Sequence, residues 1–229
     1  MGVSRLSWFA LTVLLVGCQV LGGGPGIDLR HNSDLYKSVR YSARMAADRV
    51  AFVTPLVDER TGNPITGESN AYPVDYVPDN VWPRPLIAMI EDILIDELTD
   101  SGVFRELCGE PPALDGQLIV QPVLMTARCG QEERPFGRRS FGEFGLKLVV
   151  YGPKPVDGAR PVWIQEEFGE VTSTDVGAAP PSAPKLLGQA IHGAMYRLVS
   201  RLDQSNVARS GVPLKIEAMN ASAPAEPGK

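Results

Sequence analysis

Two segments of this chain repeat apolar residues with the period of an α-helix, and each therefore needs an apolar surface to cover. The first helix is expected to begin near Asn80, with two prolines in its first turn, and to end at Gly102. The second is expected to run from Ser182, its cap, to Asp203. The apolar stripes are Leu86, Ile90, Ile93, Leu94 and Leu98 in the first, and Leu187, Ile191, Ala194, Met195, Leu198 and Leu202 in the second.

Segments rich in β-branched and apolar residues supply the surface that the helices would cover. The predicted strands are residues 49–57, 103–107, 117–129, 145–152 and 160–172, and the last two flank a turn as a hairpin. Two amphipathic helices on one face of a largely antiparallel sheet would bury both stripes. The sequence therefore predicts an α+β fold, a two-layer sandwich with both helices on one face.

Polar segments separate these elements. Residues 35–48 have weak helical character, and residues 58–80 read as a long loop with one short extended piece at 72–77. Residues 130–142 read as a flexible, basic and aromatic loop. Pro122 indicates an edge strand or a bulge within the strand that contains it.

The N-terminus predicts export and lipidation. Arg5 precedes an apolar run, Leu6–Val16, which is too short to cross a bilayer core of ~30 Å and is typical of a signal sequence. The next residues, through Leu15-Val16-Gly17-Cys18, resemble the lipobox of bacterial lipoproteins. That resemblance implies a lipid (diacylglycerol and a further acyl chain such as palmitate) on Cys18, the first residue of the mature chain. The alternatives are an ordinary signal peptide with a nearby cysteine, or a short apolar N-terminus.

The predicted organisation follows from that cleavage. It comprises a signal peptide at 1–17, the lipidated Cys18 with a flexible glycine-rich tether through 34, a single domain at 35–204 and a disordered tail at 205–229. Only Arg5 is charged in the leader, so the mature chain has 21 basic and 27 acidic residues, a net charge of −6. That sign argues against nucleic-acid binding, which needs cationic surface.

Two cysteines remain after Cys18 is lipidated. An even number in an oxidising envelope compartment favours a disulfide between Cys108 and Cys129. The intervening strand would carry its ends roughly 30 Å apart unless the chain doubles back, so two buried thiols are the equal alternative.

The sequence contains none of the motifs that mark common enzymes or metal sites. His31 lies in the tether, and His192 is expected to be solvated or half-packed on the last helix. We therefore predict no catalytic residues, no metal and no cofactor. Acidic residues on the first helix and in the hairpin are expected to face solvent: Glu91, Asp92, Asp96, Glu97, Asp100, Glu166 and Glu167.

The order of elements, the lipobox and the motif Trp82-Pro83-Arg84-Pro85-Leu86 together resemble the ABC-type transport auxiliary lipoprotein family. That family includes the lipoprotein of the paraquat-inducible intermembrane transport system and carries W-x-x-P-L at the start of its first helix. The resemblance covers residues 49–203, and the segments at 58–80 and 130–142 are longer than the family pattern.

The resemblance implies a non-catalytic outer-membrane lipoprotein that faces the periplasm and serves an envelope lipid-transport system. Gln19 after the cysteine, by resemblance to lipoprotein sorting rules, favours the outer membrane. The alternative is a structural or regulatory envelope protein that binds peptidoglycan-synthesis, motility or secretion machinery. We expect a membrane contact through the lipid and an envelope protein partner, with the oligomeric state open. The candidate partner-binding residues are Tyr76, Trp82, Phe136, Arg138 and Arg139. Trp82 is expected to be buried in the core at the start of the helix, and the alternative is an exposed anchor for a partner.

Overall fold

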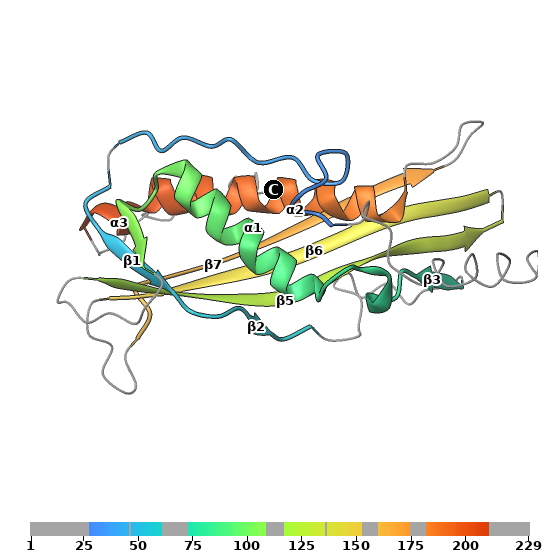
Figure 1. Cartoon of the computed structure of the whole chain (residues 1–229), viewed down its shortest axis with the longest axis horizontal. Coiled ribbons are helices and arrows are strands. Elements are labelled where there is room, and N and C mark those ends of the chain that lie inside the picture. Colours follow the sequence, from blue (N-terminus) through green and yellow to red (C-terminus); the bar gives the residue numbers. More distant parts are fainter. Residues whose placement is uncertain are drawn as a thin grey trace, which may run out of the picture.

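The structure is a computed structural model that describes residues 28–45, 47–60, 73–108, 117–135, 137–152, 160–174 and 182–210. Within these residues the chain forms a mixed sheet of seven strands with helices packed on one face (Figure 1). The predicted α+β two-layer architecture is confirmed. The predicted leader at 1–17 and Cys18 lie outside the described residues.

Three long strands form the centre and one side of the sheet. They are β5 (Leu118–Arg134), β6 (Gly137–Tyr151) and β7 (Trp163–Thr174), each antiparallel to the next. The predicted hairpin is therefore confirmed as β6 and β7. Alternate side chains point toward the helices, and Leu146 and Leu148 of β6 are fully buried there.

Four short strands lie on the other side of β5. β1 (Val50–Val53) runs parallel to β5, and β4 (Glu106–Cys108) runs parallel to β1. β2 (Val57–Asp58) and β3 (Val74–Tyr76) pair with β5 farther along its length, beyond the end of β1. The predicted strand at 49–57 is thus two short strands with Pro55 between them.

The first main helix, α1 (Leu86–Ser101), begins later than expected. A short 3₁₀ helix, η1 (Asp79–Val81), precedes it, and Pro85 rather than Asn80 is the N-cap. The backbone of Trp82 is extended because a residue before a proline disfavours helical angles. Gly102 ends the helix in the left-handed conformation, with φ 65°, as expected.

The second main helix, α2 (Ala183–Ser205), lies along β6 and β7, and a short α3 (Val207–Ser210) follows it. Ser182 is the N-cap by position, although its side chain makes no capping hydrogen bond. Both predicted stripes form the core against the sheet. The members that are at most 2% exposed are Ile90, Ile93, Leu94 and Leu98 of α1, and Leu187, Ile191, Ala194, Met195, Leu198 and Leu202 of α2.

Residues 28–45 form an extended strap, which crosses the side of the helix layer that faces away from the sheet (Figure 1). Leu29 is fully buried, and the Ala43 amide donates to the Ser101 carbonyl at 2.8 Å. A Cβ atom on Gly188 of α2 would overlap the Leu35 carbonyl, so the strap lies directly on that helix. The weak helix predicted from residue 35 is wrong, and the end of the predicted tether packs on the domain.

The flexible loop predicted at 130–142 is also wrong, because these residues continue β5 and β6 as a paired hairpin. Its charges pair across the two strands. Glu132 lies opposite Arg139 and Glu133 opposite Arg138, with a nitrogen–oxygen distance of 3.7 Å in each pair. Opposite charges at cross-strand positions favour pairing, which composition alone does not reveal.

Candidate functional site

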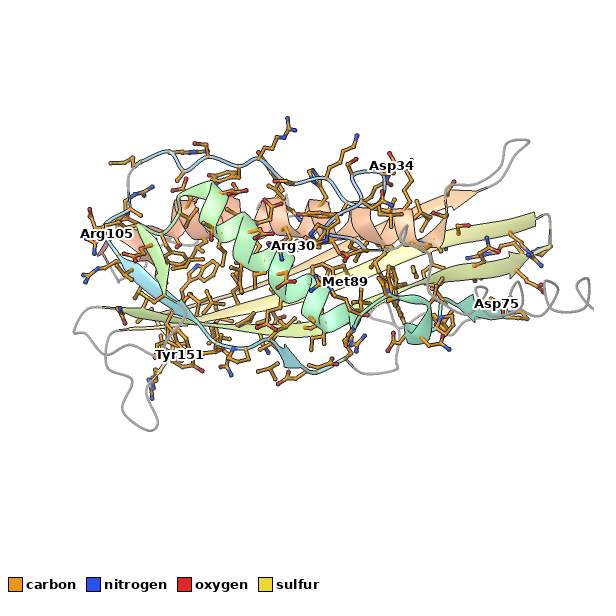
Figure 2. The ribbon with its side chains drawn as sticks, in the orientation of Figure 1. Arg30, Asp34, Asp75, Met89, Arg105 and Tyr151 are labelled. Carbon is orange, nitrogen blue, oxygen red and sulfur yellow. The ribbon has the colours of Figure 1, made fainter. Side chains whose placement is uncertain are left out.

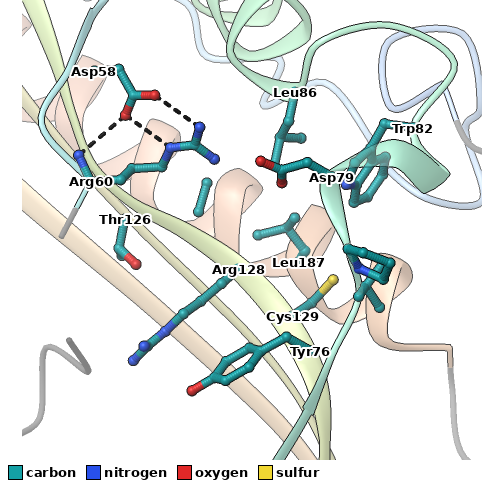
Figure 3. A pocket seen from close by; sticks show the side chains of 13 residues that line it. Asp58, Arg60, Tyr76, Asp79, Trp82, Leu86, Thr126, Arg128, Cys129 and Leu187 are labelled. Carbon is teal, nitrogen blue, oxygen red and sulfur yellow. Dashed lines mark hydrogen bonds and ion pairs between the residues drawn. The ribbon is translucent and has the colours of Figure 1, made fainter. Parts of the chain in front are cut away.

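A cleft of about 410 Å³ lies beside β5, below the start of α1 and α2 (Figure 3). This volume is within the range of about 300–1,000 Å³ that is common for small-molecule sites. Its floor is apolar: Trp82, Leu86 and Leu187 come from the helix layer, and Ala127 and Cys129 from β5. Its polar lining residues are Asp58, Arg60, Tyr76, Asp79, Thr126 and Arg128.

The cleft coincides with a gap in strand pairing along β5. β2 pairs with β5 as far as Leu124, and β3 pairs from Gly130 onward. The carbonyls of Leu124 and Cys129 accept the flanking hydrogen bonds, each at 2.9 Å. Among the described strands, none pairs with residues 125–128 on this side, and the register of β5 with β6 shifts within that interval at Thr126.

One wall of the cleft is an ion pair between Asp58 and Arg60. The guanidinium Nε and Nη2 donate to the two carboxylate oxygens at 2.9 and 2.8 Å (Figure 3). The Arg60 hydrogen bonds hold the pKa of Asp58 below its usual value, and Asp58 raises the pKa of Arg60. Sequence reasoning missed both residues. Their spacing of two at the end of a strand was the available signal, because residues two apart in extended chain lie on one face.

The opposite wall is aromatic and cationic. The Arg128 guanidinium carbon lies 5.7 Å from the centre of the Tyr76 ring, and Nε donates to Glu143 at 2.5 Å. The Tyr76 and Phe141 rings meet edge to face with their centres 5.8 Å apart. Tyr76 is 44% exposed, so this predicted partner-binding residue is accessible at the rim.

Trp82 lines the cleft and is also part of the hydrophobic core. Its side chain is 6% exposed and belongs to the main apolar cluster, which confirms the expectation that it serves the core. It also lines the cleft with Leu86, the first residue of α1. The two ends of the motif, Trp82 and Leu86, therefore line the cleft, which brings together two of the predicted site residues, Tyr76 and Trp82.

The remaining predicted partner residues do not line the cleft. Arg139 lies in the distal part of the β5–β6 hairpin, where it also pairs with Glu170 of β7 at 2.9 Å. Arg138 is exposed beside it. Phe136 and Cys18 lie outside the described residues.

Cys108 and Cys129 are both free thiols, one partly buried and one buried, so the disulfide is wrong and the equal alternative of two thiols is confirmed. Cys108 pairs with Phe52 of β1, and Phe52 pairs with Ile119 of β5. Cys129 lies ten residues farther along the same strand, which places the thiols roughly 33 Å apart at ~3.3 Å per residue. Burial raises the pKa of Cys129 to about 12.

Two buried carboxylates hold the strap: Glu97, which was expected to face solvent, and Asp203. Glu97 is 4% exposed and accepts hydrogen bonds from the Tyr36 hydroxyl at 2.7 Å and the Val39 amide at 2.9 Å. Asp203 of α2 accepts one from the Tyr41 hydroxyl at 2.8 Å (Figure 2 shows the side chains between these layers). The strap is therefore hydrogen-bonded to both helices.

The neighbouring acidic residues of α1 keep part of their solvent exposure and also form ion pairs, and Asp100 is exposed as expected. Asp96 binds Arg30 at 2.8 Å, and Asp92 binds Arg84 at 2.6 Å. Arg30 belongs to the strap and Arg84 to the segment that precedes α1, so neither pairing can be read within the helix sequence.

Two further polar side chains are held by other parts of the fold. Glu167 of β7 is buried and binds Arg197 at 2.9 Å and Arg201 at 2.8 Å, so the prediction that it faces solvent is wrong. His192 is half-buried, as expected, with Nδ1 2.8 Å from the Lys37 carbonyl oxygen.

Within the described residues, no helix is long and apolar enough to cross a membrane. The same part of the chain contains no group of three or more histidine, cysteine, aspartate or glutamate side chains placed to hold a metal ion.

Comparison with known proteins gives structural matches only. No protein-family model and no curated protein matches the chain. A Xanthomonas campestris protein described by the family model DUF330 is 12% identical, with a TM-score of 0.36 over 71% of this chain and 84% of that one. A hypothetical protein of Chlamydia trachomatis is 9% identical, with a TM-score of 0.41 over 69% and 96%. An uncharacterised protein is 15% identical, with a TM-score of 0.38 over 73% and 99%. The function therefore has to be inferred from the cleft and the sequence.

Proposed function

We propose that this chain is a lipid-anchored, non-catalytic protein of the cell envelope that works by binding a partner. The observation that carries the proposal is the cleft, which has an apolar floor formed by Trp82, Leu86 and Leu187. Burial of an apolar group on that floor would supply affinity, and the polar rim would orient it.

The ionisable groups at the cleft favour binding over turnover. The Cys129 thiol has a pKa of about 12 and therefore stays protonated near neutral pH, where a nucleophilic cysteine must be a thiolate. The Asp58 carboxylate has a lowered pKa because Arg60 holds its ionised form, which makes it a weak proton acceptor. Both groups are suited to packing and orientation.

The membrane anchor in this proposal is Cys18 of the lipobox. Nine residues lie between Cys18 and Asp28, the first described residue of the strap, so the two Cα atoms are at most ~36 Å apart. Two or more acyl chains would hold the domain at the membrane, and Gln19 favours the outer one. Anchoring raises the effective concentration of any partner in the same envelope.

The partner in this proposal is a component of an envelope lipid-transport system. The support is the resemblance carried by Trp82–Leu86, together with the position of that motif in the wall of the cleft. In this proposal, residues that carry the resemblance to the family also line the cleft and contact the partner.

Photocrosslinking in cells tests the partner. A benzophenone amino acid in place of Tyr76, at the rim, should capture a protein of a lipid-transport system. The matched control replaces Tyr196, which is 49% exposed on α2 and does not line the cleft. Capture of lipid alone at Tyr76, or equal capture at both positions, would reject a partner site at the cleft.

Fractionation tests the anchor separately. Wild-type chain should sediment with outer membranes and carry radiolabelled palmitate, whereas Cys18→Ser should do neither. Label in the Cys18→Ser protein would place the lipid elsewhere.

A further inference from the structure

The backbone of β5 faces the cleft in the interval between β2 and β3. The Val77 amide donates to the Cys129 carbonyl, so the backbone groups of Cys129 point away from β6. Backbone direction alternates along a strand, and Ala127, two residues earlier, therefore points the same way. Ala127 lines the cleft, and neither β2 nor β3 pairs with it. No other described strand pairs with Ala127 on this side, so within the described residues its N–H and carbonyl face the cleft.

The opposite edge of the sheet, β7, has charged side chains over its backbone. On β7, Arg197 donates from Nη2 to the Phe168 carbonyl at 2.5 Å, and both Arg197 and Arg201 bind Glu167. Charged side chains over an edge strand block its pairing with another chain. At the β5 interval, by contrast, the charged pair Asp58–Arg60 stands at one wall, and Leu86 of α1 and Leu187 of α2 form an apolar floor.

We propose that the cleft binds an extended peptide segment of the partner, which adds to β5 as a short strand between β2 and β3. This rests on the proposed binding function and specifies the form in which the partner binds. The open interval, residues 125–128, spans roughly 13 Å at ~3.3 Å per residue, which accommodates about three residues of a guest strand.

The side chains around the interval define what the peptide should carry. Successive residues of a strand point to opposite faces. One guest residue would therefore lie on the floor of Trp82 and Leu187, and its neighbours would point outward beside Tyr76 and Arg128. In strand addition, backbone hydrogen bonds supply affinity and such pockets supply specificity. The expected sequence is an apolar residue between two polar ones.

A lipid acyl chain fits the same interval less well. It would cover the N–H and carbonyl of Ala127 without offering either a hydrogen bond, and buried backbone groups without partners are costly. A peptide backbone satisfies both. The chemistry of the edge therefore favours polypeptide over lipid.

Peptide selection on the full chain in detergent tests the proposal. The probe is a displayed library of random peptides of about twelve residues, from which an enriched peptide is labelled and its affinity measured by fluorescence anisotropy. Ala127→Pro removes the edge N–H. Pro122 already occupies the equivalent orientation in β5, because the Leu124 carbonyl two residues later accepts from the β2 side. Ala127→Gly is the control that retains the N–H.

Ala127→Pro should weaken the peptide about tenfold or more, and Ala127→Gly by no more than about twofold. Unchanged affinity in a folded Ala127→Pro protein would overturn the proposal. Hydrogen exchange on wild-type protein gives a second test that needs no variant: the peptide should slow exchange of the Ala127 amide about tenfold. If no peptide does so, or if only phosphatidylethanolamine–phosphatidylglycerol vesicles do, the occupant is not an added strand.

These outcomes separate the two proposals. Peptide binding that depends on Ala127, combined with no protein captured from Tyr76 in cells, would support the strand site and reject the envelope partner. Capture of a transport protein from Tyr76 with no dependence on Ala127 would do the reverse.

Discussion

The hydrogen bond between Tyr36 and Glu97 should contribute measurably to folding stability. It joins the strap to α1 in a buried setting, where the Tyr36 hydroxyl donates to the Glu97 carboxylate at 2.7 Å and Glu97 is 4% exposed. Tyr36→Phe removes the donor and keeps the ring. The Val39 amide, at 2.9 Å from the same oxygen, remains in place.

The size of the effect follows from the charge of the acceptor. Hydrogen bonds to charged groups contribute about 1.5–3 kcal/mol, and loss of one donor leaves the buried carboxylate less well satisfied. We expect Tyr36→Phe to lower the free energy of unfolding by about 2 kcal/mol, which corresponds to roughly 4–8 °C in Tm for a domain of this size.

Urea unfolding of the full chain, followed by circular dichroism, measures this change. The matched control is Tyr196→Phe, whose ring is 49% exposed and which should change stability by less than about 0.5 kcal/mol. If the two variants are equally stable, the Tyr36 hydroxyl does not hold the strap on α1 and the reasoning is refuted.

Three further outcomes can be measured with the same unfolding assay. Burial, and then the hydrogen bond to Glu97, raise the pKa of Tyr36 in the folded chain. This tyrosine's contribution to stability should therefore be full below about pH 10, where the unfolded chain also keeps it protonated, and should fall as the pH rises further. Tyr36→Phe should make that fall shallower. Leu94→Ala, at a fully buried site of α1, should cost about 2–5 kcal/mol, and a cost below about 0.5 kcal/mol would contradict its place in the core. A chain that begins at Leu35 should be less stable by about 2 kcal/mol than one that begins at Asp28, because it lacks the fully buried Leu29; equal stability would show that this end of the strap adds nothing.

Periodicity was sufficient to predict the layers of the fold. An apolar stripe identifies the face of a helix that must be buried, and Leu94 and Leu198 are indeed fully buried against the sheet. The β-branched and apolar content of residues 145–152 and 160–172, with the turn between them, predicted β7 and the second half of β6. These signals are local, and each can be read within one element.

The strap and the distal hairpin depend on pairings that are distant in sequence or hidden by composition. An extended segment has no period of its own, and Glu97, which binds it, lies 61 residues beyond Tyr36. The charged residues of the hairpin resemble a solvated loop until Glu132 is placed opposite Arg139. The secondary-structure propensity of single residues does not indicate which residues will pair with one another.

The cleft was predicted in part. Tyr76 was predicted from the long loop at 58–80 and Trp82 from the W-x-x-P-L motif, and both line it, whereas Arg138 and Arg139 do not. The gap at Ala127 arises where strands of two and three residues stop short of each other on β5. Strand ends of that size have no sequence signal strong enough to locate.

The strap also determines how the domain would respond to mechanical tension. In a lipid-anchored chain, a pull from the membrane reaches the described part of the domain at Asp28 and travels along the strap. The contacts of Arg30, Tyr36 and Ala43 with α1 follow one another along the chain, so they would be loaded and would detach in turn. Release of residues 28–45 would lengthen the tether by up to ~60 Å while the β5–β6–β7 ladder stays unloaded.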